Sequence, residues 1–243
     1  MNIVILWDWM AAARARLRQS RAARRAFEVT DFVIVDVETT GWSPGEAGMT
    51  EIGAVRMAGG QIRAEFSTLV NPGLEIPPDI VALTGISNAM VAAAPPAAEA
   101  MTAFLDFARG AVLAAHNAPF DISFLAAACA GGGLPGPAGP VLDTVPLARR
   151  LLAEGALAAD DVPNCKLSTL AGYFGAPPGP QHRALADARA TAAVLEGLLA
   201  MFTTRGVRTV AGLLAEQEYA LRAEVSRPQS PDGCESGARG GIR

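Results

Sequence analysis

The sequence predicts an α/β fold, and three observations predict it. An apolar, β-branched run at residues 33–37 is typical of a central strand. Two more strand-like segments, residues 51–57 and 61–70, follow it and are joined by a glycine-containing turn, which indicates a hairpin. Beyond residue 96, helical and strand-like patterns alternate. With 243 residues and 51% hydrophobic content, the chain is long enough to bury a sizeable core.

The first strand carries two carboxylates near its end. Side chains alternate between the faces of a strand, so Asp36 and Glu38 point to the same side with only Val37 between them. Two like charges at that spacing repel each other, and a shared proton or a bound hard cation offsets the repulsion. The alternative is that the strand ends by Asp36 and both side chains are simply solvated.

Short helices and turns follow the hairpin. Residues 79–83 and 87–91 have short helical patterns, and between them Gly85 permits close approach of the backbone to a ligand or forms an ordinary turn. The apolar periodicity of residues 97–109 predicts an amphipathic helix.

A second polar segment lies where a strand meets a helix. Residues 111–115 read as a short buried strand, and His116, Asn117 and Asp121 follow it at the start of a helix that runs to about residue 129. Such junctions are common positions for sites in open α/β sheets. The alternative is that Asp121 is a favourable charge in the first turn of the helix.

The second histidine precedes a long helix. Residues 141–145 are predicted as a strand, and residues 146–154 and 166–174 as helices. A helix then extends to residue 202, with His182 at its entrance and Asp187 about one turn inside, and residues 207–222 form a last helix. Both histidines of the chain therefore fall in candidate site segments.

The charge is uneven along the chain. Residues 1–30 hold six arginines against two acids, and 14 basic and 22 acidic residues remain after them. The arginine stripe over residues 10–26 predicts a basic arm that docks on a partner, nucleic acid or an anionic membrane, or is simply solvated. The body, by contrast, would hold few phosphates. The three cysteines indicate reduced thiols, and the first residues lack the pattern of a secretory signal, so we expect a cytoplasmic protein.

Three motifs together resemble a known family. Asp-x-Glu-Thr-Thr-Gly at 36–41, His-Asn-Ala-x-Phe-Asp at 116–121 and His-Arg-Ala-x-x-Asp at 182–187 are similar to the three motifs of the DEDDh, or DnaQ-like, 3′–5′ exonucleases. The likeness is in particular to the proofreading epsilon subunit of bacterial DNA polymerase III and its stand-alone relatives. It implies a ribonuclease H-like mixed sheet, with the first three strands antiparallel and helices on both faces.

The resemblance also implies the roles of the site residues. Asp36, Glu38 and Asp187 would bind one Mg²⁺ or Mn²⁺ ion directly, and Asp36, with Asp121 acting through water, would hold a second ion. His182 would be the general base, because imidazole exchanges protons near neutral pH. The residues expected to contact the terminal nucleotide are Thr39, Thr40, Gly41, Asp79, Thr84, Ile86, Asn117 and Phe120.

The expected organisation is a basic arm at residues 1–30, an exonuclease domain at 31–205, a C-terminal helix at 206–225 and a disordered tail at 226–243. The leading hypothesis is a metal-dependent 3′–5′ exonuclease that acts on single-stranded or frayed DNA ends and works alone or with a DNA polymerase subunit. Three alternatives remain: an RNA-trimming exoribonuclease like ribonuclease T or oligoribonuclease, a non-catalytic module that binds nucleic acid or a polymerase, and a Mg²⁺ phosphatase on another α/β fold.

Overall fold

The structure is a computed structural model that describes residues 25–137 and 139–225. The basic helix predicted over residues 10–26 lies outside the described residues except for its last two positions. The predicted tail at 226–243 lies outside them altogether. Within the described part of the chain, no helix has the length and apolar character needed to cross a membrane.

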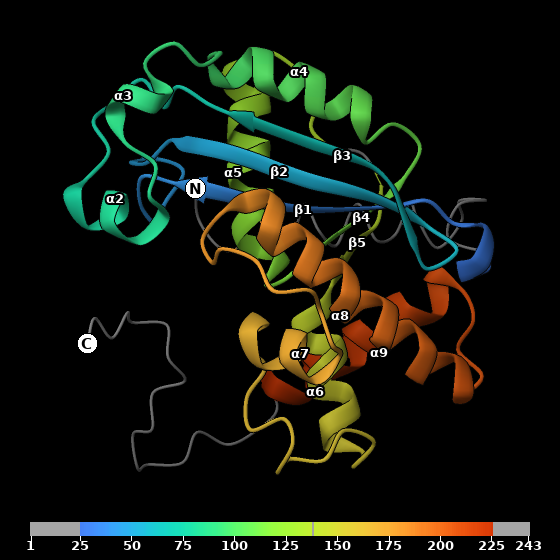
Figure 1. Cartoon of the computed structure of the whole chain (residues 1–243). Coiled ribbons are helices and arrows are strands. Elements are labelled where there is room, and N and C mark those ends of the chain that lie inside the picture. Colours follow the sequence, from blue (N-terminus) through green and yellow to red (C-terminus); the bar gives the residue numbers. More distant parts are fainter. Residues whose placement is uncertain (1–24, 138, 226–243) are drawn as a thin grey trace.

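Five strands form one mixed sheet in the order β3-β2-β1-β4-β5 (Figure 1). The strands are β1 (Phe32–Thr39), β2 (Met49–Ala58), β3 (Gln61–Leu69), β4 (Val112–Ala115) and β5 (Val141–Asp143). The pairs β1–β2 and β2–β3 are antiparallel, whereas β4 is parallel to both β1 and β5. The predicted α/β fold with three antiparallel first strands is therefore confirmed, and β1 is its central strand.

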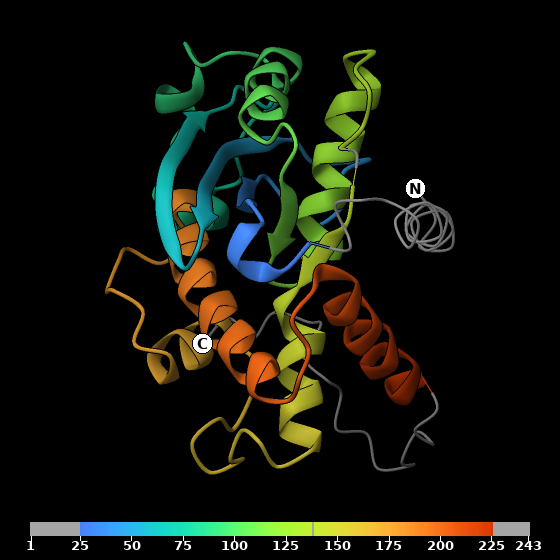
Figure 2. The same cartoon turned by 90° about the vertical axis from the view of Figure 1, so that its right-hand side faces the viewer.

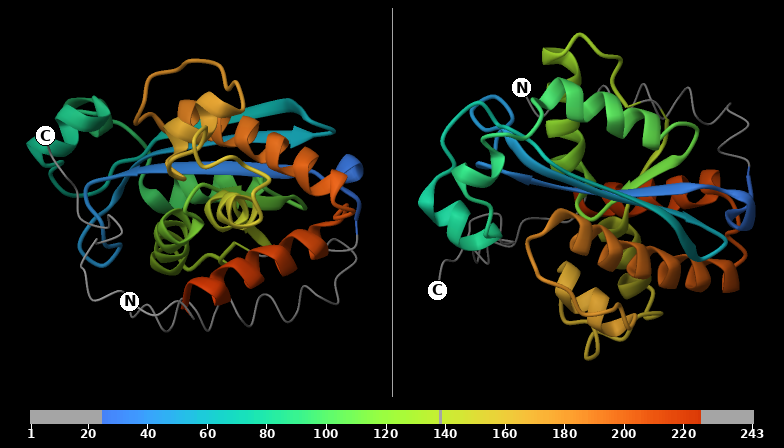
Figure 3. Two further views of the ribbon diagram at one scale, coloured as in Figure 1. Left: turned by 90° about the horizontal axis from the view of Figure 1, so that it is seen from below. Right: turned by 45° about the horizontal axis from the view of Figure 1, so that its top comes forward.

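Helices cover both faces of the sheet (Figures 2 and 3). The described helical elements are η1 (Phe27–Val29), α2 (Pro78–Thr84), α3 (Asn88–Val91), α4 (Ala97–Phe107), α5 (Ala118–Gly131), α6 (Thr144–Ala153), α7 (Leu167–Tyr173), α8 (Ala184–Thr204) and α9 (Val210–Val225). Phe32 and Ile34 pack in a buried cluster with side chains of α6, α8 and α9. Val33 and Val35 pack on the opposite face against α4 and α5. This alternation along β1 decides which helices meet its polar end.

Two helix boundaries differ from the predicted ones for local reasons. The strand predicted over 141–145 ends at Asp143, because its carboxylate accepts a hydrogen bond from the backbone N–H of Val145 and thereby caps α6. The last helix begins at Val210 because Gly206 adopts a left-handed φ of 83° and the Thr209 hydroxyl accepts the N–H of Gly212.

Candidate active site

Three carboxylates meet at the end of β1. Asp36 and Glu38 continue the face of Ile34, which is the face that α8 covers, and Asp187 arrives from the first turn of α8. One oxygen of each of the three carboxylates lies within 4.8 Å of the others. The strand period and the helix position together therefore bring three acids, 151 residues apart in sequence at the extremes, to one point.

Asp121 approaches the same strand from the other face of the sheet. It lies in the first turn of α5 and is only 3% exposed. Its Oδ1 accepts a hydrogen bond of 3.0 Å from the backbone N–H of Val37, the residue between Asp36 and Glu38. Asp121 lies outside the group of three oxygens above but lines the same pocket. The hydrogen bond fixes α5 against the strand that carries the other acids.

The pKa values of all four acids are raised. Burial raises the pKa of Asp36 well above its ordinary value, and the charges of Asp121, Glu38 and Asp187 raise it further. Burial also raises the pKa of Glu38 to about 8, with Asp187 and Glu51 adding to the shift. The pKa values of Asp121 and Asp187 are raised mainly by burial as well. A cluster of hard oxygen donors with uncompensated negative charge fits a divalent cation such as Mg²⁺ or Mn²⁺.

The entrance of α8 carries His182. This residue has a left-handed φ of 58°, which is uncommon for a residue other than glycine. Its backbone N–H donates a hydrogen bond of 3.0 Å to Oδ2 of Asp187, so the chain bends back toward its own helix. The bend places the exposed imidazole at the wall of the pocket that Asp187 also lines.

The entrance of α8 is tied to β2 by a buried acid. Glu51, 3% exposed, accepts two hydrogen bonds from the Arg183 guanidinium at 3.0 and 2.9 Å and one from the backbone N–H of Ala184 at 3.0 Å. Close by, an added Cβ at Gly53 of β2 would lie 2.1 Å from the backbone nitrogen of Leu185. The first turn of α8 therefore rests directly on the backbone of β2.

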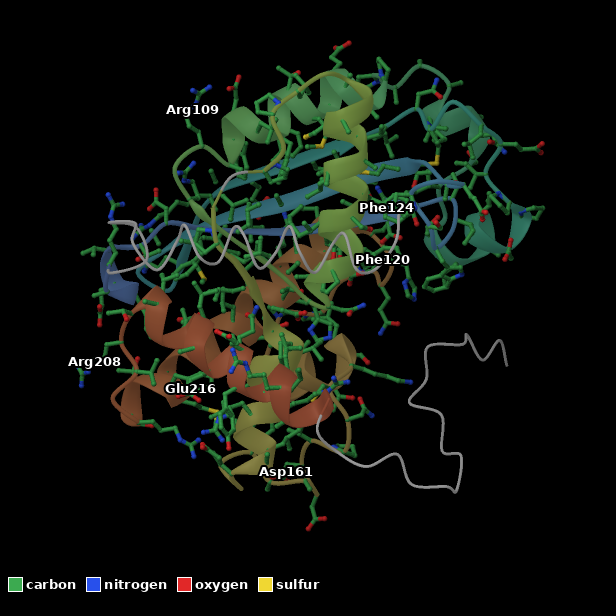
Figure 4. All side chains as sticks on the ribbon, turned by 180° about the vertical axis from the view of Figure 1, so that it is seen from behind. Arg109, Phe120, Phe124, Asp161, Arg208 and Glu216 are labelled. Atoms are coloured by element: carbon green, nitrogen blue, oxygen red, sulfur yellow. The ribbon has the colours of Figure 1, made fainter. Side chains whose placement is uncertain are left out.

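Apolar side chains form one wall of the pocket. Trp42, Ile80, Leu83 and Phe120 line it together with the acids. Trp42 is 78% exposed, and its ring meets the ring of Phe120 edge-on with centroids 6.1 Å apart. Figure 4 shows Phe120 on α5 next to Phe124, which is in ring contact with it. The pocket therefore offers an accessible aromatic surface beside a cluster of carboxylates.

The residues predicted to contact a nucleotide divide into two groups. Five line the pocket: Thr39, Gly41, Thr84, Asn117 and Phe120. The other three do not. Thr40 is buried and its hydroxyl accepts the N–H of Gly48; Ile86 is buried in a small cluster with Ile76 and Val91; and Asp79 is exposed in the first turn of α2. For these three the structure does not support contact with a ligand in this pocket.

Five residues that line the pocket were not predicted as site residues: Val37, Trp42, Ile80, Leu83 and His116. The four apolar ones gave no signal of their own, because an apolar residue in a strand, loop or short helix is equally typical of a core. His116 was noticed but given no role. Its Nδ1 lies 2.7 Å from the Thr144 hydroxyl, and the backbone of Cys165 provides a second hydrogen bond. Burial lowers the pKa of His116 to about 4, so this ring is neutral at pH 7.

A second cavity adjoins the first. It lies between α7 and the start of α8, has a volume of about 650 Å³ and is also lined by His182 and Asp187. His182 therefore lies between the two cavities and lines both of them. Solvent reaches the imidazole from either side.

A family model and several known proteins match most of this chain. The model of the RNase_T family, described as "Exonuclease", matches residues 33–195. A candidate bifunctional exonuclease/endonuclease protein of Mycobacterium tuberculosis is 47% identical over 191 residues, which is 76% of this chain and 29% of that protein. An epsilon-like protein of DNA polymerase III from Rhodobacter capsulatus is 40% identical over 207 residues, 82% of this chain and 28% of that protein. The chain thus spans less than a third of either relative.

Solved structures show the same fold. Exonuclease X in complex with 5′ overhanging duplex DNA matches with a TM-score of 0.58 and 29% identity, covering 76% of this chain and 99% of that one. Exonuclease I of E. coli in complex with a dA16 oligonucleotide has a TM-score of 0.66 at 18% identity, covering 80% of this chain and 45% of that one. These matches confirm the expected ribonuclease H-like fold.

Proposed function

Because the chain belongs to the RNase_T family of exonucleases, we propose that it is a metal-dependent 3′–5′ exonuclease that releases nucleoside monophosphates from single-stranded or frayed DNA ends. One observation carries the proposal. Oxygens of Asp36, Glu38 and Asp187 lie within 4.8 Å of one another in the wall of a pocket that also contains an exposed histidine and an exposed tryptophan. Acids to hold cations, a base and a stacking surface are what hydrolysis at a nucleic-acid end requires.

Two Mg²⁺ or Mn²⁺ ions would be held by the four carboxylates. Asp36, Glu38 and Asp187 would be the ligands of one, and Asp36, supported by Asp121, would hold the other. When bound, the cations supply the positive charge that makes water a better nucleophile and stabilises the departing oxygen. The raised pKa values of the four acids support this assignment, because a bound cation would offset the burial and the mutual repulsion that disfavour their charged forms.

His182 is the general base in this proposal. Its imidazole takes a proton from the attacking water; the water oxygen bonds to phosphorus, the bond from phosphorus to the 3′ oxygen breaks, and that oxygen takes up a proton from solvent. A nucleoside 5′-monophosphate then leaves, with a 3′ hydroxyl on the shortened strand. The exposure of His182 between two cavities supports this role. His116 is the weaker candidate, since burial lowers its pKa to about 4, which makes it a poor proton acceptor, and its ring already contacts the Thr144 hydroxyl and the backbone of Cys165.

The apolar wall would hold the base of the terminal nucleotide. Trp42 and Phe120 offer ring faces and edges, and Leu83, 48% exposed, lines the same pocket from α2. Stacking of this kind tolerates every base, which suits an enzyme that removes nucleotides in succession. Thr39 and Gly41, at the end of β1, line the pocket close to the acids and would approach the sugar and phosphate.

DNA is the proposed substrate because the named relatives include DNA polymerase III proteins and the matched Exonuclease X is in complex with DNA. The same names make a DNA polymerase subunit the proposed partner and the cytoplasm the proposed location. Any membrane contact would belong to the basic arm, of which residues 1–24 lie outside the described residues.

A digestion experiment tests the proposal. Matched single-stranded DNA, duplex DNA and RNA, labelled at the 5′ end, are incubated with the full chain and Mg²⁺ or Mn²⁺, and the products are identified by mass spectrometry. We expect a ladder shortening from the 3′ end of DNA and release of 5′-monophosphates. Faster loss from RNA would favour the exoribonuclease alternative, and loss from the 5′ end would contradict the proposed polarity.

A pair of isosteric variants tests the site in the same assay. Asp36→Asn removes a central charge and should lower the rate on the order of 10³-fold. Asp161→Asn makes the same chemical change at an exposed position between α6 and α7, on the side of the molecule away from Phe120 (Figure 4), and should leave the rate unchanged. Equal rates for Asp36→Asn and the unaltered chain would show that the chemistry occurs elsewhere.

A further inference from the structure

We infer that Gln217, on the C-terminal helix α9, is a positioning residue for the active site; the inference rests on the proposed function. The family match ends at residue 195, so it does not include α9. Even so, Gln217 is a polar residue that is only 3% exposed. A buried amide is retained where both its donor and its acceptor find partners, and the partners here lead directly to the site.

The amide of Gln217 completes the free edge of the sheet. On one side β5 pairs with β4, and on the other side no strand of residues 25–137 and 139–225 neighbours it. There Oε1 of Gln217 accepts the backbone N–H of Asp143 at 2.8 Å, and Nε2 donates to the carbonyl of Val141 at 3.4 Å. Groups two residues apart on a strand point in the same direction. The side chain therefore makes the two hydrogen bonds that an additional strand would make.

The strand residue held in this way carries a structural carboxylate. Asp143 is 7% exposed, and its Oδ1 accepts the N–H of Val145 and the N–H of Asn117, each at 3.0 Å. The N–H of Ala118 provides another hydrogen bond. Asn117 adopts a left-handed φ of 64°, which is sparsely populated outside glycine and needs support from its surroundings. Asp143 thus fixes the tight turn from β4 into α5.

That turn sets the position of three pocket residues. Asn117 precedes the first residue of α5, and Phe120 and Asp121 lie in the first turn of this helix. Asp121 in turn accepts the N–H of Val37 in β1. A continuous series of hydrogen bonds therefore runs from Gln217 through Asp143 and the start of α5 to the strand that carries Asp36 and Glu38.

Separate contacts hold α9 in place. Glu216, labelled in Figure 4, accepts a hydrogen bond of 2.8 Å from Arg150 of α6, and Val210 and Leu213 are buried in the main cluster. Because these contacts anchor the helix without Gln217, loss of the amide alone should leave α9 docked. The effect on the site is therefore separable from loss of the helix.

Gln217→Met tests the inference, because methionine keeps the length of the side chain and removes both hydrogen bonds. We expect kcat to fall roughly 10- to 100-fold with KM within about twofold, since a small displacement of reacting groups costs rate. Hydrogen exchange of the backbone amides at residues 37, 117, 118, 120 and 121 should become at least about tenfold faster. Leu213→Ala is the matched control, because it weakens the packing of α9 and leaves the amide; its kcat per folded molecule should be unchanged.

A second variant tests the route through the strand. Asp143→Ser keeps an acceptor that can cap α6 but is too short to hold Asn117 as well. It should reproduce the fall in kcat and the faster exchange, and the double variant with Gln217→Met should be no worse than Asp143→Ser alone. Additive effects would place the two residues on separate paths and overturn the inference.

The outcomes also separate this inference from the proposed function. If Gln217→Met leaves exchange at residues 117–121 unchanged, or changes it no more than Leu213→Ala at equal Tm, Gln217 does not position the site. If the unaltered chain degrades no nucleic acid, the proposed function fails, and the exchange measurement still decides whether Gln217 holds this turn.

Discussion

His182 shows how one residue serves the site through both its backbone and its side chain. Its N–H donates to Asp187, and its left-handed φ turns the imidazole into the wall of the pocket. Any substitution at this position therefore affects two properties, the ring and the backbone conformation. A test of the ring must hold the backbone constant.

His182→Asn meets that condition, because asparagine adopts left-handed φ values readily. We expect kcat to fall roughly 10²- to 10⁴-fold, the usual contribution of general acid–base catalysis. Affinity for Mn²⁺ should change little, because the backbone N–H still donates to Asp187. The measurements are single-turnover rates and a Mn²⁺ titration. His182→Gly, which relaxes the backbone further, should lose the same activity, and a kcat within threefold of the unaltered chain in either variant would rule out the proposed base.

Trp42 is a large apolar side chain that is exposed and lines the pocket. At 78% exposure the ring contributes little to folding, so Trp42→Ala should change the free energy of unfolding by less than about 0.5 kcal/mol. Loss of stacking costs about 1–3 kcal/mol per base, which predicts a KM raised roughly 5- to 150-fold. Steady-state kinetics on oligonucleotides measure this, with Trp42→Phe as the milder variant. A substrate whose last nucleotide lacks a base should abolish the difference; if the difference persists, Trp42 does not bind the base.

At the scale of elements, the site depends on how closely α8 approaches β2. Gly53 allows the first turn of α8 to rest on the strand backbone, and Glu51 holds Arg183 and Ala184 beside it. The helix delivers Asp187, and its entrance delivers His182. The distance from Asp36 and Glu38 on β1 to Asp187 on α8 is therefore set by a neighbouring strand that contributes no residue to the carboxylate cluster.

Gly53→Ala should separate these two elements. An added Cβ would lie 2.1 Å from the nitrogen of Leu185 and 2.2 Å from the carbonyl carbon of Ala184, so backbone must move. Overpacking of this kind typically costs about 1–3 kcal/mol, and activity should be lost beyond what the fall in stability explains. Gly172→Ala in α7, where nothing lies within 4 Å, should be neutral or stabilising by up to about 1 kcal/mol. Denaturant unfolding and kcat check both; a fully active Gly53→Ala chain would contradict the close contact.

Features that depend on near neighbours in the chain could be predicted from the sequence. The strand period placed Asp36 and Glu38 on one face, and the turn signal at Gly59 and Gly60 identified the hairpin, because both depend on near neighbours in the chain. The role of Glu51 was not predicted, since its partner Arg183 lies 132 positions away. The pairing of Gln217 with β5 was missed for the same reason. Contacts between distant segments leave no periodic signal.

The pocket wall shows a related limit. The motif at residues 36–41 identified the two acids of β1. Its two threonines, however, have different environments: Thr39 lines the pocket, whereas the Thr40 hydroxyl accepts the backbone N–H of Gly48. Ile86 was expected to contact a ligand and is instead buried in a small apolar cluster, while Leu83, three residues earlier in α2, lines the pocket. A sequence motif identifies the segment that forms the pocket wall, but only the fold determines which of its side chains face the pocket.

At the scale of the whole molecule, the active site joins the two layers of helices. Asp121 comes from α5 on one face of the sheet, and Asp187 comes from α8 on the other, and both meet β1 near its carboxyl end. Each helix adds one carboxylate to a site where β1 already provides two, those of Asp36 and Glu38. Folding therefore gathers like charges, and the free energy of unfolding must depend on whatever neutralises them.

Protons neutralise these charges when no cation is present. The pKa of Glu38 rises from about 4.5 in the unfolded chain to about 8 in the folded one, and those of Asp36, Asp121 and Asp187 shift in the same direction. The folded state therefore binds more protons than the unfolded state. This contribution to stability is fully present below about pH 4.5 and is lost as the pH rises through about 8.

The resulting prediction concerns the Tm of the full chain in chelator, measured between pH 5 and pH 8.5. It should fall as the pH rises, and Mn²⁺ should restore it most strongly at pH 8.5, where the cation no longer competes with protons; a concentration 100 times Kd adds about 2.7 kcal/mol. Glu38→Gln should flatten the profile in chelator and weaken the response to Mn²⁺, whereas Asp161→Asn should do neither. A Tm in chelator that rises over this range, or an equal Mn²⁺ response in Glu38→Gln, would show that these four acids do not form the cation site.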